Sequence, residues 1–153
     1  MHMEQCVNGC CWIYKRENYP AQVNWDFRHK YNRPKAGVFV HDPIEKRILL
    51  VQSRGMKWGP PKGTVEYSDG NIIDCALREL LEETGITMKT DDLVNDSVQL
   101  FQISRATYFY VMRSVCPVEP KDIDITGYTW IKTNCAKQLD LNSHCKQLLK
   151  KLE

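Results

Sequence analysis

The chain has 153 residues, the size of one compact domain. Hydrophobic residues make up 42% of it and charged residues 26%, and the net charge of +2 at pH 7 demands no nucleic-acid partner. The longest apolar run, Ile48-Leu49-Leu50-Val51, is too short to span a bilayer, and no signal-like segment opens the chain, so we expect a cytoplasmic protein with no membrane partner.

An N-terminal arm, residues 1–35, has no hydrophobic period and precedes the main part of the same domain, residues 36–153. Its aromatic residues are Trp12, Tyr14, Tyr19, Trp25, Phe27 and Tyr31, and its interleaved basic residues include Lys15, Arg16, Arg28, Lys30 and Arg33. Such a mixture can stack bases and follow an RNA backbone. We favour the alternative that Trp12, Trp25 and Phe27 simply pack onto the sheet. Pro34 restricts the residue before it to extended geometry and marks the boundary.

Seven cysteines are scattered along the chain: Cys6, Cys10, Cys11, Cys75, Cys116, Cys135 and Cys145. An odd number without a secretion signal indicates reduced thiols and no disulfide partner. Cys6, Cys10 and Cys11 raise the question of zinc, but zinc sites usually contain a C-x2-C pair and a second pair downstream, and neither is present. We therefore expect these three residues to act as ordinary small hydrophobic side chains.

Two strands and a loop are predicted after the arm. Residues 36–40 form an apolar run typical of a buried strand, Asp42-Pro43 predicts a turn, and residues 48–52 predict the partner strand of a hairpin. Residues 55–63 are expected to form a Gly-rich loop, because two consecutive prolines within it remove backbone donors from any strand ladder.

A helix with clear ends is predicted next. Asn71 is the favoured N-cap, because Asp74 then occupies the third helical position. Gly85 suits the left-handed residue that closes a helix. Between these ends, apolar residues recur at steps of three and four: Ile73, Ala76, Leu77 and Leu80. The helix is therefore expected to pack on the core through one face.

Three further strands and a second helix are predicted beyond this helix. The strands cover residues 98–103, 107–112 and about 128–131, and an amphipathic C-terminal helix begins at Ala136. The apolar positions of this helix are Leu141, Cys145, Leu148, Leu149 and Leu152. Strands interleaved with two helices predict an α/β fold.

The first helix carries three carboxylates, Glu79, Glu82 and Glu83, which project from one face because they stand three and four residues apart. That face lies opposite the apolar stripe. Acidic groups this close raise one another's pKa values unless a cation lies among them, and hard oxygen ligands suit Mg2+ or Mn2+. Arg78 can hold the carboxylate of Glu82, four residues on, in place. The other interpretation is an acidic helix face that is only solvated.

Together with a preceding glycine, this helix resembles the signature of the Nudix hydrolases, G-x5-E-x7-R-E-U-x-E-E-x-G-U, where U is a bulky aliphatic residue. The matching residues are Gly63 and the run Arg78-Glu79-Leu80-x-Glu82-Glu83-x-Gly85-Ile86. The interval from Gly63 to Arg78 is one residue longer than in the family, and Gly70, beside Asp69, stands where the first glutamate belongs. We expect the extra residue in the loop before the helix, since a shift within the helix would scramble its stripe.

The resemblance implies a Nudix-type α/β/α sandwich with a mixed sheet, a catalytic helix after the Gly-rich loop, and the C-terminal amphipathic helix. It implies a pyrophosphohydrolase in which Glu79, Glu82 and Glu83 bind the catalytic cations, Mg2+ or Mn2+, and in which Arg78 belongs to the catalytic residues. Such cations bridge a diphosphate, neutralise developing charge and lower the pKa of the attacking water.

Further candidate residues lie outside the signature. Related enzymes often take another acid from a loop before the last strand, where this chain has Asp122 and Asp124, and we count Asp124 as catalytic. In the Gly-rich loop, Trp58, Lys62 and Gly63 are candidate substrate-binding residues, with Lys62 as a point charge for the phosphate chain. A purely solvated role is the alternative for the loop acids and for Lys62.

Two segments bear on the substrate. The runs Trp58-Gly59-Pro60-Pro61-Lys62-Gly63 and Asp74-Cys75-Ala76-Leu77-Arg78 are similar to those of dinucleoside polyphosphate hydrolases and of mRNA-decapping Nudix enzymes. We expect hydrolysis of a phosphoanhydride bond in a nucleoside diphosphate-linked substrate, a dinucleoside polyphosphate or a similar small nucleotide. One alternative is an mRNA-decapping hydrolase whose affinity for capped RNA falls steeply with salt. The other is a Nudix-fold module that binds nucleotide without catalysis, favoured by the missing first glutamate and opposed by the three that are intact.

Overall fold

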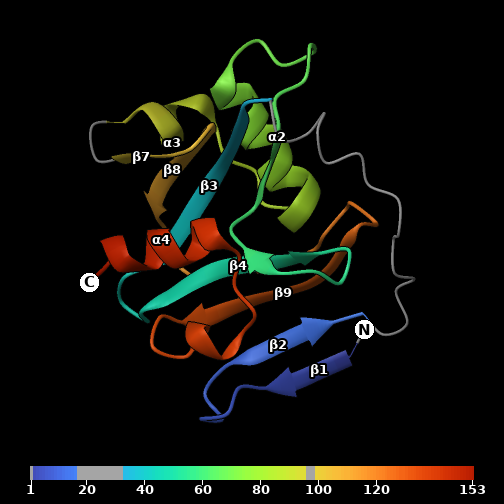
Figure 1. Cartoon of the computed structure of the whole chain (residues 1–153), viewed down its shortest axis with the longest axis vertical. Coiled ribbons are helices and arrows are strands. Elements are labelled where there is room, and N and C mark those ends of the chain that lie inside the picture. The colour runs from blue at the N-terminus through green and yellow to red at the C-terminus, as the bar shows by residue number, and fades with distance from the viewer. Residues whose placement is uncertain (1, 17–32, 96–98) are drawn as a thin grey trace.

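A nine-stranded sheet dominates the computed structural model, which describes residues 2–16, 33–95 and 99–153 (Figure 1). The main order across the sheet is β1-β2-β9-β4-β3-β8-β7, with β5 beside β4 and β6 beside β3. The strands are β1 (His2–Gln5), β2 (Trp12–Lys15), β3 (Lys35–Asp42), β4 (Arg47–Ser53), β5 (Trp58–Gly59), β6 (Lys62–Thr64), β7 (Gln99–Ile103), β8 (Ala106–Met112) and β9 (Ile125–Lys132). The helices are α2 (Ile72–Thr84), α3 (Thr90–Val94), the 3-10 turn η1 (Ala136–Gln138) and α4 (Ser143–Lys151). Every helix of the described ranges is too short or too polar to cross a membrane.

Helices cover both faces of this sheet, and alternation along the strands fills two cores. In β3, Val38 and Val40 join the core beneath α2, whereas Phe39 joins the core beneath α4. In β4, Leu49 joins the first core and Leu50 the second. The sheet is mixed, because β3 runs parallel to β8 and antiparallel to β4 and β6. The expected α/β/α sandwich with a mixed sheet is confirmed.

The predicted strands are present, and the expected hairpin is present in shortened form. Strands β3, β4, β8 and β9 contain the predicted strand segments, and β7 covers residues 99–103, while Val98 lies outside the described residues. The predicted hairpin of β3 and β4 pairs only next to its turn, at His41–Ile48 and Asp42–Arg47, because farther from the turn the facing edges of the two strands pair with β6 and β5 instead. The expected loop contains two short strands, β5 and β6, on either side of the consecutive prolines.

The C-terminal helix begins later than the sequence indicates. Residues 136–138 form only the 3-10 turn η1, and the chain then extends alongside β5, where Trp58 N–H donates to the Asp140 carbonyl at 2.8 Å. Asn142 N–H donates in return to the Trp58 carbonyl at 2.8 Å, and the Asn142 side chain caps α4 by accepting from Cys145 N–H. These pairings outweigh the helical pattern at Ala136, which is why a continuous helix does not form.

Part of the N-terminal arm forms a hairpin, β1 and β2, that extends the sheet at β9. Tyr14 stacks on Tyr128 of β9 with ring centroids 4.7 Å apart. Trp12, which was expected to pack onto the sheet, is half exposed. The remaining predictions for the arm fall on residues 17–32, outside the described residues; they concern Tyr19, Trp25, Phe27, Tyr31, Arg28 and Lys30.

A buried pair between β8 and α4 predicts how stability depends on pH. Tyr108 Oη lies 2.6 Å from His144 Nδ1, and burial, followed by the charges of Lys62 and Lys35, lowers the pKa of His144 to about 4. The unfolded chain takes up this proton near pH 6.5, so the folded state loses stability as pH falls from about 6.5 to about 4. We expect His144→Gln to reduce the loss of urea unfolding free energy between pH 7 and pH 5. An unchanged loss in the variant would show that His144 does not titrate in this way.

Candidate active site

Helix α2 has the ends that its sequence predicts. Asn71 is the N-cap and accepts from Asp74 N–H at 2.9 Å, and Gly85 is the left-handed C-cap with φ of 74°. A side chain at position 85 would also strike the Glu119 carbonyl, 2.5 Å from an added Cβ. Local capping therefore fixes the register of the carboxylates along the helix.

Two of these carboxylates, Glu79 and Glu83, lie on a cavity of about 500 Å3 between α2 and the loop that contains β5 and β6. Both residues are only 8% exposed, because the loop packs directly against this face of the helix. The Lys62 N–H donates to Glu83 Oε1 at 3.2 Å. The carboxylates of Glu79 and Glu83 are therefore covered by the loop rather than by solvent.

Burial has an electrostatic consequence for both carboxylates. Desolvation raises the pKa of Glu79 despite the nearby Arg78, and it raises the pKa of Glu83 further, with the charge of Glu79 adding to the effect. Adjacent buried carboxylates are costly to ionise unless a cation offsets their charge. Their oxygen atoms are the hard ligands that Mg2+ and Mn2+ prefer, so the residues fit the divalent cation that Nudix enzymes use.

Gly63 allows the close approach of the loop to Glu79. A Cβ at this position would lie 2.1 Å from the Glu79 carboxylate, so no larger residue fits without moving it. We expect Gly63→Ala to keep the fold but to reduce activity at least about 10-fold, as found when the support of a metal ligand is disturbed. Circular dichroism and steady-state kinetics at saturating Mg2+ test this. Wild-type kcat in a folded variant would show that the position of Glu79 is not critical.

Arg78 joins the helix to the preceding loop. Its Nε and Nη2 donate to both oxygens of Asp69 at 2.9 Å, and its Nη1 donates to Glu79 Oε1 at 2.9 Å. The Asp69 side chain is only 4% exposed, and the Arg78 hydrogen bonds lower the Asp69 pKa to about 2. Glu82 lies 3.4 Å from Arg78 Nη1. The expected partner of Arg78, Glu82, is thus the weaker one, and Asp69 beside the missing glutamate takes the main role.

Glu82 differs from the other two carboxylates. Its side chain is 43% exposed and turned toward Arg78, and it does not belong to the described lining of the cavity. The three carboxylates were expected to share one site. Of the three, Glu79 and Glu83 are in the described lining of the cavity, and Glu82 is not. The carbonyl of Glu82 accepts from the N–H groups of Lys121 and Asp122 at 2.9 and 2.8 Å.

These backbone bonds bring the predicted loop acids to the same cavity, which Asp122 and Asp124 both line. Asp122 Oδ1 accepts from Asp124 N–H at 2.9 Å, and its charge contributes to the raised pKa of Glu83. Asp124 Oδ2 accepts from Arg54 Nη2 at 2.8 Å. Residues distant in sequence from the helix thus supply two more carboxylates at the cavity.

Basic side chains line the same cavity. Lys62 is the one that the sequence indicated, and burial, followed by the charge of Lys35, lowers its pKa to about 8. No spacing pattern in the sequence indicated that the others would meet here, since they come from the start of β3 and the residues just before it, and from the turn after β4: Arg33, Lys35, Arg54 and Lys57. Trp58 lies instead in the core beneath α4, 2% exposed, and is not part of the described cavity lining. Its predicted contact with substrate does not agree with this placement.

Comparison with known proteins places this geometry in context. A family model described as the NUDIX domain matches residues 31–150. The chain is 34% identical over 151 residues to a protein of Invertebrate iridescent virus 3 that is named as a hydrolase, 111R. The alignment covers 94% of this chain and 85% of that protein. It is 27% identical over 111 residues to mRNA decapping complex subunit 2 of Schizosaccharomyces pombe, covering 69% of this chain and 15% of that protein.

The fold also occurs among solved structures. A C. elegans Ap4A hydrolase in a binary complex superposes with a TM-score of 0.60 at 20% sequence identity, covering 77% of this chain and 94% of that one. At this identity the likeness concerns the arrangement of helices and strands, which is the arrangement that brings α2 against the Gly-rich loop.

Proposed function

The chain belongs to the Nudix hydrolase family, and from this premise we propose that it hydrolyses a phosphoanhydride bond in a dinucleoside polyphosphate or a similar small nucleotide. The observation that carries this proposal is one cavity lined both by buried carboxylates, Glu79 and Glu83, and by basic side chains. A polyphosphate substrate needs both features, cation-binding oxygens at the bond that breaks and positive charge along the phosphates that remain.

We assign Glu79 and Glu83 as the main ligands of Mg2+ or Mn2+, with Glu82 as a further ligand at the edge of the site. A bound divalent cation neutralises charge on the phosphates and lowers the pKa of water. Arg78 holds Glu79 through its 2.9 Å hydrogen bond and is itself fixed by Asp69. The helix and the loop thereby keep the carboxylates in place before substrate arrives.

Positioned side chains supply the remaining roles. Asp124, held by Arg54 at 2.8 Å, is the proposed acceptor of the proton from the attacking water. Lys62, Lys35 and Arg33 are placed on the cavity where they can bind the phosphate chain. Gly63 acts by allowing the loop to approach Glu79 rather than by contacting substrate.

All the cysteines are free, which supports the proposed cytoplasmic location.

A substrate screen tests the proposal. Purified protein is incubated with dinucleoside polyphosphates, nucleoside triphosphates and ADP-ribose, each with Mg2+ and with Mn2+, and products are separated by anion exchange. We expect a dinucleoside polyphosphate to give the highest kcat/KM, with no turnover in the presence of EDTA. A nucleoside triphosphate or ADP-ribose as the best substrate would overturn the substrate class while leaving the site assignment intact. Binding of nucleotide without turnover of any of them would favour a binding module.

RNA decapping is the second candidate, favoured by the relative in the Schizosaccharomyces pombe decapping complex and by Arg33 and Lys35 at the cavity. Charge reversal of Arg28 and Lys30 together separates the two activities; both lie outside the described residues, and Arg33 is left intact because it lines the cavity. For a decapping enzyme, capped RNA binding should weaken and its salt dependence should flatten. Hydrolysis of a dinucleoside polyphosphate should change far less, because that ligand is too short to follow the arm.

A further inference from the structure

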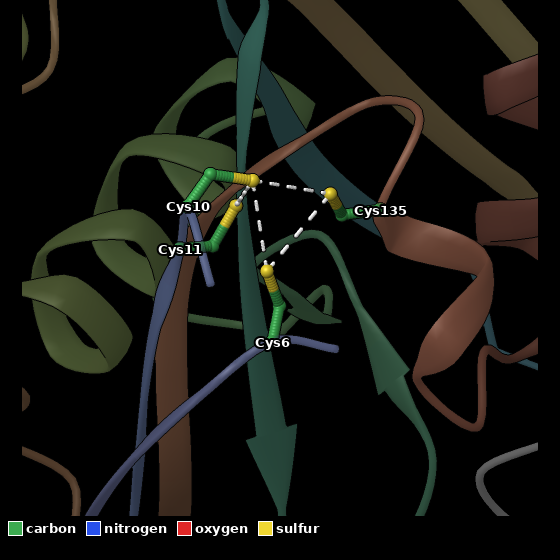
Figure 2. Close-up of side chains that lie close together, drawn as sticks. All are labelled: Cys6, Cys10, Cys11 and Cys135. Atoms are coloured by element: carbon green, nitrogen blue, oxygen red, sulfur yellow. Dashed lines mark hydrogen bonds between the residues drawn. The ribbon is translucent and has the colours of Figure 1, made fainter. Parts of the chain in front are cut away.

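A second group of chemically reactive side chains lies away from the active site, where the hairpin of β1 and β2 meets the end of β9. The turn of this hairpin carries Cys6, Cys10 and Cys11, and Cys135 comes from the segment between β9 and η1 (Figure 2). Cys6 N–H donates to the Cys11 carbonyl at 2.9 Å, and Gly9, with φ of 74°, donates to the Cys6 carbonyl at 2.9 Å. The tight turn therefore gathers three sulfur atoms on one side.

The four sulfur atoms lie at the spacing of a single coordination sphere. Cys10 Sγ is 3.5 Å from Cys135 Sγ, 3.6 Å from Cys6 Sγ and 3.7 Å from Cys11 Sγ. All four atoms lie within 4.8 Å of one another. Four thiolates arranged tetrahedrally at about 2.3 Å from zinc lie about 3.8 Å apart. Figure 2 shows the four side chains converging from the turn and from the segment after β9 on one point.

Hydrogen-bond donors surround these sulfur atoms, as expected for ligands that carry negative charge. Arg47 Nη1 and the Lys132 N–H each donate to Cys11 Sγ at 3.3 Å, and Asn8 Nδ2 donates to Cys135 Sγ at 3.4 Å. Arg47 is held there by the carbonyl of Cys10, which accepts from its Nη2 at 2.9 Å. A cation and N–H groups directed at sulfur stabilise thiolates and orient them for a metal.

We propose that Cys6, Cys10, Cys11 and Cys135 bind one zinc ion through four thiolates. Tetrahedral sulfur donors select zinc among the divalent ions, and an iron–sulfur cluster, which interposes several iron and sulfide atoms, needs thiolates further apart. A disulfide would use only two of the four sulfurs, whereas Cys10 has three sulfur neighbours at nearly equal distances. The binding step releases any thiol protons to solvent and involves no oxidation.

The role of this site is structural. Four protein thiolates fill the tetrahedral coordination of zinc, so no coordination position is open to substrate. Cys6, Cys11 and Cys135 belong to the core beneath α4, on the sheet face opposite α2 and the proposed catalytic cations. Zinc at this place fastens the N-terminal hairpin to the end of β9. A zinc ion here would not depend on the substrate of the active site, and it would give these cysteines a role beyond that of the small hydrophobic side chains expected from the sequence. The sequence alone does not indicate this site, because the fourth proposed ligand, Cys135, lies 125 residues beyond Cys10.

Metal analysis of the wild-type chain tests this proposal. Protein produced with zinc in the medium is washed with EDTA, which strips the proposed catalytic cations, and is then analysed by mass spectrometry for metals. We expect about one zinc per chain to remain, and a mercurial reagent that blocks thiolates to release it. Protein produced with cobalt should show the thiolate charge-transfer and tetrahedral ligand-field bands of a Co2+–thiolate site. Retention of no metal, retention of iron in place of zinc, or a disulfide among these cysteines would overturn the proposal.

Matched variants locate the zinc. Cys10→Ser and Cys135→Ser should each lose most of the bound zinc and unfold at a lower temperature. Cys145→Ser, which changes a fully buried cysteine of the same core outside the cluster, should keep it. Zinc retained in all three variants, or lost from all three, would overturn the assignment to these ligands. If the cluster variants do not fold, the cobalt spectrum and zinc content of the wild-type chain decide the question.

Discussion

Replacement of Glu83 by glutamine should lower kcat by at least about 100-fold, the upper end of what is lost when a residue that only supports a metal ligand is changed. The amide keeps the shape of the side chain and can still accept from the Lys62 N–H, which lies 3.2 Å from Glu83 Oε1. It removes the charge that a divalent cation requires. The same variant should lose the rise in melting temperature that Mg2+ gives the wild-type protein, because a ligand stabilises only the state that binds it.

The metal-free protein gives this prediction a second readout. Glu83 and Glu79 are buried side by side and their pKa values are raised, so the wild-type site is electrostatically costly without a cation. Glu83→Gln should therefore melt at or above the wild-type temperature in EDTA. Glu66→Gln is the matched control, since Glu66 lines the same cavity but has a side chain that is 57% exposed. Wild-type kcat for Glu83→Gln at saturating Mg2+ would disprove the assignment of Glu83.

The parts of this site that the sequence predicts are those fixed by local interactions. Asn71, Asp74 and Gly85 determine where α2 begins and ends, and each acts within one turn of the helix. The spacing of the carboxylates follows from the helix, whatever packs against it. The burial of Glu79 and Glu83 does not follow from the helix. It depends on the loop at Gly63, a separate segment of the chain that packs against Glu79. A helical pattern can place side chains on one face but cannot say what covers that face.

Non-local pairing also explains where the structure differs from the fold predicted from the sequence. The helical pattern that begins at Ala136 is broken because residues 140–142 hydrogen-bond to Trp58, whose position depends on the preceding loop. Trp58 was expected at the substrate, yet it fills the core beneath α4 and abuts Gly127, where an added Cβ would lie 2.7 Å from its ring. An aromatic residue beside a Gly-rich loop suits either place, and only the packing of the sheet decides between them.

Loss of Arg78 should have the largest effect on stability. Arg78→Met keeps most of the side-chain volume but leaves the Asp69 carboxylate, with a side chain only 4% exposed, without its bidentate partner. A hydrogen bond to a charged group contributes about 1.5–3 kcal/mol, and we expect a loss in this range because the pair is only part-buried, with the Arg78 side chain 24% exposed. The Thr64 carbonyl also loses the Nη2 donor at 3.3 Å. Urea unfolding at pH 7 should show this decrease, and activity should fall because the loop before α2 is no longer tied to Glu79.

A double-mutant cycle separates the ion pair from the other contacts of Arg78. Asp69→Asn removes the charge that Arg78 neutralises, so the variant carrying both Asp69→Asn and Arg78→Met should recover part of the stability lost in Arg78→Met alone. Recovery will be incomplete, since Glu79 also accepts from Arg78 at 2.9 Å. If the two losses simply add, Asp69 and Arg78 are not coupled, and the residue beside Gly70 does not replace the missing glutamate as an anchor of the helix. If they couple as expected, Asp69, beside the position of the missing glutamate, is a carboxylate that holds the arginine and through it the start of the helix.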